Sequence, residues 1–213
     1  ALPYREGFSR IERHLRDLGR PRTALCAAEL RIPAPLTFEG FASFNQGYRG
    51  VLEEWGLLVN GQNPVARTNV APVVAPPAEP SFYAFSYTVP SSAAGFMTFV
   101  VAGSGELRRD VLQGEGIVRR GETTPEAMRE KCHYVMGVMR SRLEGLGADW
   151  AQVSAVDVYT PHPIESFLVP ALLEPMGPAV LHGVRWFLSH PPTVGLDFEM
   201  DMRGLRQELL LDR

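Results

Sequence analysis

Apolar side chains recur every three or four residues in several stretches of the chain, which is the spacing of an amphipathic helix. The clearest stretch follows Thr124, a suitable N-cap, and Pro125, which suits the first position of a helix. Its apolar face consists of Met128, Cys132, Val135, Met136, Met139 and Leu143. Gly145 or Gly147 is expected to end this helix. Further helices are expected over residues 8–18, 38–55 and, in a form broken by prolines, 165–173.

Short runs of β-branched and aromatic residues between turn signals predict strands. They are expected over residues 23–32, 82–89, 97–102, 153–159, 183–188 and 194–202. Strands mixed with helices in this order predict an α+β fold in which a mixed sheet carries its helices on one face. In the last strand, strict alternation places Asp197, Glu199 and Asp201 on one face. That face is expected either to be solvated or to line a cleft between subunits.

A gapless shift of 128 residues brings two parts of the chain into correspondence. Leu15 then aligns with Leu143, Glu29 with Asp157, and the proline pair that begins at Pro33 with the pair at residues 161 and 163. In both parts a helix, a glycine, a strand and the proline pair follow in the same order. We interpret the chain as two diverged copies of one unit.

The boundary between the two copies is expected near the most proline-rich stretch of the chain. Residues 72–80 contain four prolines, which is typical of a linker. The predicted division is therefore a shortened first unit at residues 1–78 and a complete second unit at 79–213. The strand expected at 82–89 can be the last of the first unit or the first of the second.

The composition is that of a folded protein with little charge bias. Of the 213 residues, 45% are apolar, and the formal charge of −3 provides no general attraction to nucleic acid. No apolar run is long enough to span a membrane, and the first residues lack a signal-peptide pattern. The two cysteines allow at most one disulfide. We therefore expect a soluble cytoplasmic protein that binds neither nucleic acid nor membranes.

Several common kinds of active site are disfavoured by the residues present. The five histidines and two cysteines lack the spacings of a metal site, and the chain lacks the Gly-x-Ser-x-Gly signature of serine hydrolases. Gly103-Ser-Gly105 is not a dinucleotide-binding motif, because Arg108 occupies the place of its third glycine. Lys131 is the only lysine, so arginines are the default groups for binding anions. We expect no metal and no cofactor.

Several of these segments together resemble a known family. Ala102-Gly103 at the end of an apolar strand, Asn63-Pro-Val-Ala-Arg67-Thr, Val184-Arg185 and Leu196-Asp-Phe-Glu199 are similar to motifs of the RidA (YjgF/YER057c/UK-type) superfamily of enamine and imine deaminases. The resemblance covers most of the chain and implies two RidA/chorismate-mutase-like units in tandem. Each half lacks a motif that the other half has, which favours one composite pocket between unlike halves.

The resemblance also implies roles for individual residues. Arg67 or Arg185 would grip a substrate carboxylate through two parallel hydrogen bonds. The alternative for Arg67 is a surface arginine in a salt bridge, and for Arg185, which adjoins Trp186, it is stacking or packing against a partner. Glu199 would act as a general base or position water. The backbone of Gly103 and Ala102 would bind the substrate, and Asn45 and Tyr83 would supply orienting hydrogen bonds. The working arginine is left open between the two.

The activity implied is cofactor-free hydrolysis of a 2-enamino or 2-imino acid to a 2-oxo acid and ammonia. A 2-aminomuconate-type product of aromatic ring cleavage is the leading substrate class, and clearance of 2-aminoacrylate is the rival. The alternative outside enzymes is a non-catalytic module that binds small carboxylates. RNA cleavage, which the resemblance also brings in, finds no basic stripe here. We expect a homo-oligomer, a trimer or a multiple of three, with pockets at its interfaces.

Overall fold

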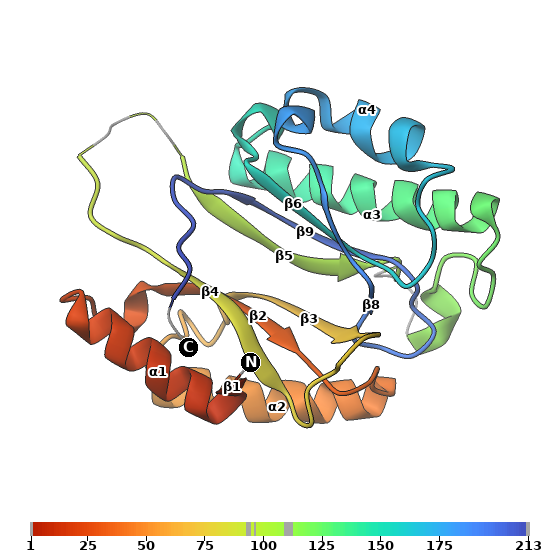
Figure 1. The fold of residues 1–213 in the computed structure, drawn as a ribbon. Helices are drawn as coiled ribbons and strands as arrows, with labels where there is room; N and C mark the ends of the chain where they lie inside the picture. The colour runs from red at the N-terminus through yellow and green to blue at the C-terminus, as the bar shows by residue number, and fades with distance from the viewer. Residues whose placement is uncertain (1, 93–94, 96, 109–112, 212–213) are drawn as a thin grey trace.

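The computed structural model of the chain describes residues 2–92, 95, 97–108 and 113–211. Two β-sheets lie face to face in the middle of the molecule, and helices cover the outer face of each (Figure 1). The layers are thus helix, sheet, sheet and helix. This confirms the α+β class, and each sheet carries its helices on one face, as expected.

The first sheet has the strand order β1-β4-β2-β3-β8. Its strands are β1 (Leu2–Pro3), β2 (Leu25–Arg31), β3 (Ala66–Pro72), β4 (Ser81–Tyr87) and β8 (Ser189–His190). The central strand β2 runs parallel to β3 and antiparallel to β4. Two helices, α1 (Tyr4–Asp17) and α2 (Phe38–Glu54), cover its outer face (Figure 1).

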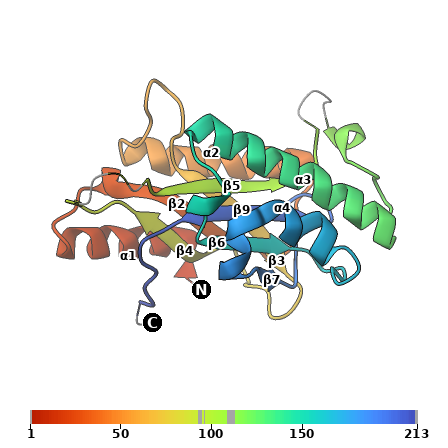
Figure 2. The same cartoon turned by 90° about the horizontal axis from the view of Figure 1, so that it is seen from above.

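The second sheet has the strand order β5-β9-β6-β7. Its strands are β5 (Phe99–Gly105), β6 (Ala155–Tyr159), β7 (Arg185–Phe187) and β9 (Glu199–Gly204). Here β6 runs parallel to β7 and antiparallel to β9. The long helix α3 (Pro125–Leu146) lies across this sheet (Figure 2). Beside α3 lie a π-helical turn (Leu168–Leu173), α4 (Glu174–Met176) and a 3₁₀ turn (Gly177–His182). Three more 3₁₀ turns are Arg22–Ala24, Gln113–Gly116 and Trp150–Gln152.

The two sheets repeat one plan. In each, an outer strand, a helix, a central strand, a helical segment, a parallel strand and an antiparallel strand follow in order. This supports the two-copy interpretation, which stays a prediction. The strand β4 pairs with β2, so it belongs to the first sheet. Residues 72–80 therefore join β3 to β4 within the first sheet. The division into units at 78/79 stays a prediction.

Local sequence signals explain where the helices begin and end. The hydroxyl of Thr124 accepts a hydrogen bond from the backbone N–H of Ala127 at 3.3 Å, which caps α3 as predicted. Gly147 ends α3 with a φ of 69°, a left-handed conformation that glycine adopts without strain. The helix expected at 165–173 is instead the set of short turns, because Pro170, Pro175 and Pro178 interrupt a regular helix.

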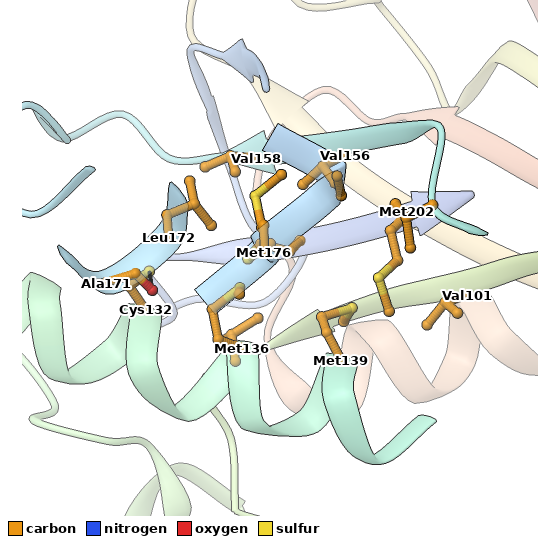
Figure 3. Packing of buried hydrophobic residues seen from close by; sticks show 14 of the residues in the cluster. Val101, Cys132, Met136, Met139, Val156, Val158, Ala171, Leu172, Met176 and Met202 are labelled. Carbon is orange, nitrogen blue, oxygen red and sulfur yellow. Dashed lines mark hydrogen bonds between the residues drawn. The ribbon is translucent and has the colours of Figure 1, made fainter. Parts of the chain in front are cut away.

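Two hydrophobic clusters hold the helices to the sheets. The larger one joins α3 to the second sheet and is rich in methionine, including Met136, Met139 and Met202 (Figure 3). The methionine stripe of α3 is therefore core packing. Because Met200 and Met202 of β9 face α3, the residues between and beside them turn toward the first sheet. Within the described residues, no helix combines the length and hydropathy needed to cross a lipid bilayer.

Candidate active site between the two sheets

A layer of charged and hydroxyl side chains separates the two sheets. It contains Glu29 and Arg31 of β2, Thr68 of β3, Asp157 and Tyr159 of β6, and Glu199, Asp201 and Arg203 of β9, all of them buried. Glu199 and Asp201 are thus neither solvated nor exposed in a cleft, because the first sheet covers them. Asp197 does not share their face as predicted, since it precedes β9 and pairs with Lys131 of α3. Burying ionised groups is costly unless they are paired, so the pairing of this layer decides what it can do.

Arg203 is the centre of this layer. Its guanidinium donates hydrogen bonds to Glu29 and to Asp157, one from each sheet. These are the two acids that the 128-residue shift aligns. Asp201 lies 3.4 Å from the same guanidinium and accepts a hydrogen bond of 2.9 Å from the hydroxyl of Tyr159. Arg203 therefore ties the sheets together with side chains that occupy equivalent places in the two units.

The same three carboxylates stand close enough to one another to ligate a metal ion. The positively charged guanidinium of Arg203 already lies among these carboxylates, so they do not require a metal cation. Burial, followed by the charges of Glu29 and Asp157, raises the pKa of Asp201 to about 7, while Arg203 opposes this rise. The cluster is thus an ion network with a proton to exchange near neutral pH.

Glu199 and Gly103 meet at one end of the layer. A Cβ built on Gly103 would collide with Glu199 Oε1 and lie 2.9 Å from Thr68 Cγ2, so only glycine fits between them. The N–H of Gly103 donates to the hydroxyl of Thr68 at 3.1 Å. Burial, then the charges of Asp201 and Glu106, raises the pKa of Glu199 well above its ordinary value, opposed by Arg142 and Arg67. Burial therefore favours the protonated form of Glu199.

Arg67 and Asn45 form a second group beside this one. The guanidinium of Arg67 donates a hydrogen bond to Asn45 Oδ1 and lies 4.6 Å from the ring centroid of Tyr48. Phe41 and Phe44 of α2 lie 5.6 and 5.4 Å away from it. Burial lowers the pKa of Arg67, while Tyr48 and Glu199 oppose this shift. The arginine is thus packed against aromatic rings and within the electrostatic field of Glu199.

Arg185 and Tyr83 belong to a different part of the layer. Arg185 donates to Asp157 at 2.7 Å and to Glu208 at 2.8 Å, so both sides of its guanidinium are paired with acids. Tyr83 stacks on Arg31, whose guanidinium carbon is 3.9 Å from the ring centroid, and contacts Phe187 edge to face. Of the predicted site residues, Arg67, Asn45, Ala102, Gly103 and Glu199 come together around β3 and β5, and these two do not join them.

The space inside the layer is small. A cavity of about 10 Å³ lies among Glu29, Arg67, Thr68 and Asp201, which is room for about one water molecule. It is far smaller than a six-carbon dicarboxylate. Arg67 of β3 and Gly103 of β5 are the parts of this group that are partly exposed.

Some residues that shape the site were not singled out from the sequence. Thr68 follows Arg67 and holds Gly103, and Arg142 of α3 donates to the carbonyl of Ala102 at 2.6 Å. The sequence contained a signal for Arg203, because the two acids that bind it align with each other under the 128-residue shift. Arg142 had no such signal, since a half-buried position on a helix does not reveal what the side chain reaches.

Lys131, the only lysine in the sequence, is buried, and its charge is paired with acidic side chains. Its ammonium group lies 2.7 Å from Asp197 Oδ2 and 3.1 Å from Glu106 Oε1. Glu106 also accepts hydrogen bonds from the backbone N–H groups of Asp197 and Phe198, at 2.7 and 3.1 Å. This cluster fixes the chain immediately before Glu199.

Comparisons with known proteins show the family to which the chain belongs. Residues 1–209 match the model of the family described as 2-aminomuconate deaminase CnbZ. The chain is 42% identical over 212 residues to 2-amino-5-chloromuconate deaminase of Comamonas testosteroni, a match that covers 99% of this chain and 84% of that protein. The expectation of a protein like the 2-aminomuconate deaminases is thereby confirmed.

Two solved structures are also similar to the chain. A chorismatase is 13% identical, with a TM-score of 0.49, and the match covers 93% of this chain and 68% of the chorismatase chain. A putative endoribonuclease from Klebsiella pneumoniae is 15% identical, with a TM-score of 0.32, over 50% of this chain and 91% of its own. By its match to the family model and to the Comamonas enzyme, the chain belongs to the 2-aminomuconate deaminase CnbZ family.

Proposed function

We propose that this deaminase hydrolyses a 2-aminomuconate-type enamine acid to the corresponding 2-oxo acid and ammonia, with no cofactor. The observation that carries the proposal is the position of Glu199: a buried carboxyl with a raised pKa, in contact with Gly103 and in the field of Arg67. A carboxyl whose pKa is raised is suited to give and take a proton in turn, which is what enamine hydrolysis requires.

In the proposed reaction, Glu199 gives its proton to the enamine carbon next to the amino-bearing carbon. The C=C electron pair forms the new C–H bond, and the nitrogen becomes an iminium. The resulting carboxylate takes a proton from water as the hydroxide oxygen bonds to the iminium carbon. Glu199 then protonates the amine, and ammonia leaves as the hydroxyl proton returns to the carboxylate. Glu199 ends as it began, and the products are a 2-oxo acid and ammonia.

Arg67 is the proposed carboxylate-binding residue, in preference to Arg185. Arg185 already pairs with Asp157 and Glu208, whereas Arg67 has a neutral partner in Asn45. A substrate carboxylate beside Arg67 would exchange a neutral hydrogen bond for a charge-assisted one, which is roughly twice as strong. Its aromatic neighbours hold the guanidinium plane in place. The amino-bearing carbon would then face Gly103 and Glu199.

Two further expectations remain proposals. The inter-sheet cavity is too small for the substrate, which supports a pocket completed by a second copy of the chain in a homo-oligomer, a trimer or a multiple of three. Light scattering on the purified protein measures the mass of the assembly and tests this. The sparse cysteines favour the cytoplasm, which cell fractionation tests.

The experiment is ammonia release from 2-aminomuconate and from 2-amino-5-chloromuconate. We expect Glu199→Gln to lower kcat by about 10² to 10⁴, the usual contribution of general acid–base catalysis. Arg67→Ala should lower kcat/KM about 10- to 100-fold, since a hydrogen bond to a charged group contributes about 1.5–3 kcal/mol. The control is Arg22→Ala, which removes an exposed ion pair with Glu12 and should leave both constants unchanged. Absence of ammonia above the buffer rate with both compounds would overturn the proposal.

A further inference from the structure

The strand β5 is irregular at the site. Val101 pairs with Met202 and Ser104 with Met200, so Ala102 and Gly103 together oppose the single residue Asp201. This is a β-bulge, which inserts one residue into a strand and takes backbone groups out of the ladder. The freed groups need other partners, because unpaired backbone groups away from water are costly.

Two side chains from different layers supply those partners. From the first sheet, the hydroxyl of Thr68 accepts the N–H of Gly103 at 3.1 Å. From the helix layer, Arg142 Nη1 donates to the carbonyl of Ala102 at 2.6 Å and lies 3.4 Å from that of Gly103. The bulge is thus fastened on both sides, and the arginine bonds come from a residue about 40 positions further along the chain.

The geometry points to Arg142 as a positioning residue of the active site, which holds the Ala102–Gly103 bulge so that the Gly103 backbone stays against Glu199. The proposal rests on the role given to Glu199 in the proposed function. An arginine suits the task, because its rigid planar guanidinium offers donors to two carbonyls at once, whereas an ammonium is a compact point charge. Half-buried on the last turns of α3, Arg142 reaches the sheet while its backbone stays in the helix.

Arg142 also influences the proton affinity of Glu199. The groups that face Glu199 are Asp201 and Glu106, whose negative charges raise its pKa, and Arg142 and Arg67, whose positive charges lower it. Loss of the Arg142 charge should therefore raise the pKa of Glu199 further. The shape of the bulge and the charge beside Glu199 are two separable contributions of one side chain.

Two substitutions of Arg142 separate its effect on the shape of the bulge from the effect of its charge on Glu199. Arg142→Lys keeps the charge on a shorter side chain that lacks the planar guanidinium. Arg142→Gln keeps a donor without the charge. We expect both to lower kcat at least tenfold with a smaller change in KM. Only Arg142→Gln should move the Glu199-dependent limb of the pH–rate profile, to higher pH. Arg140→Gln, on an exposed position of the same helix, is the matched control and should change neither.

The decisive measurements do not depend on turnover alone. The carboxyl ¹³C signal of Glu199, assigned by its loss in Glu199→Gln, should titrate at higher pH in Arg142→Gln than in wild type and in Arg142→Lys. Hydrogen exchange at the Gly103 amide should accelerate in both variants. Unchanged exchange together with an unchanged titration would overturn the inference, whether or not the wild-type protein releases ammonia. An inactive wild type with the expected titration and exchange would overturn the proposed function and leave the role of Arg142 standing.

Discussion

The raised pKa of Asp201 makes a quantitative prediction about stability. Burial and the neighbouring acids raise this pKa from 3.8 to about 7 in the folded chain. An acid whose pKa is higher when folded binds more protons in the folded state between these two values. Folding stability that depends on this proton is therefore present at low pH and is lost as the pH rises toward and through 7. Between pH 4.5 and 8.5 the loss is about 3 kcal/mol, since one pKa unit corresponds to about 1.4 kcal/mol.

The substitution that tests this is Asp201→Asn. The amide keeps an oxygen that accepts the 2.9 Å hydrogen bond from Tyr159 and has no proton to lose. The variant should therefore gain about 3 kcal/mol relative to wild type on going from pH 4.5 to pH 8.5. The slope that Glu106 adds is common to both proteins and cancels in the comparison. Glu29 and Glu199 lose a neighbouring negative charge in the variant, which lowers their pKa values and adds to the difference with the same sign.

The assay is urea unfolding followed by far-UV circular dichroism at the two pH values. The comparison uses the difference in unfolding free energy between variant and wild type, so any pH-independent cost of the amide drops out. Asp17→Asn, at an exposed position at the end of α1, is the control and should show no such difference. If Asp201→Asn and wild type lose stability in parallel as the pH rises, Asp201 is ionised throughout and the reasoning about the buried layer is wrong.

Two more substitutions probe the packing between the sheets. Gly103→Ala should lower kcat at least tenfold, because its Cβ would collide with Glu199. The control is Gly137→Ala, whose Cβ meets open space on α3, so it should keep activity and add up to about 1 kcal/mol of stability. Equal rates of ammonia release from the two variants would contradict the contact between Gly103 and Glu199. Arg203→Met leaves Glu29 and Asp157 without their shared cation, so it should lower the free energy of unfolding by about 3–5 kcal/mol in urea at pH 7. A decrease of less than about 1 kcal/mol would show that these ion pairs do not hold the sheets together.

The helices were largely predictable, because their signals are local. Thr124 caps α3 and Gly147 ends it in the structure as in the sequence, since both act on backbone groups within a few residues. The strand that carries Glu199 was expected over residues 194–202, whereas it runs over Glu199–Gly204, so the predicted alternation holds for Glu199 and Asp201 but not for Asp197. The predicted surroundings of that face were wrong. Alternation tells which residues share a face but not what covers that face. The first sheet covers it, and that contact joins residues more than 100 positions apart.

The same distinction between local and long-range contacts applies to the candidate site. Arg67 and Asn45 are brought together by two elements that follow each other in the chain, and Gly103 and Glu199 by neighbouring strands of one sheet. Arg185 could not be separated from Arg67 by sequence motif alone, because the two stand at similar places in the two halves. What separates them is the pairing of Arg185 with Asp157 and Glu208, and the second of these comes from beyond the last strand.

The buried layer explains how two similar halves give one site. The acids that correspond in the repeat, Glu29 and Asp157, both bind Arg203, so their charges serve to join the sheets. Asp201 and Glu199 lie on the same strand as this arginine, two and four residues before it, and both have raised pKa values. Of these two, Glu199 is the one in contact with a glycine bulge at a sheet edge. Because a Cβ at residue 103 would collide with Glu199, this contact requires glycine, and we expect proton transfer to depend on it.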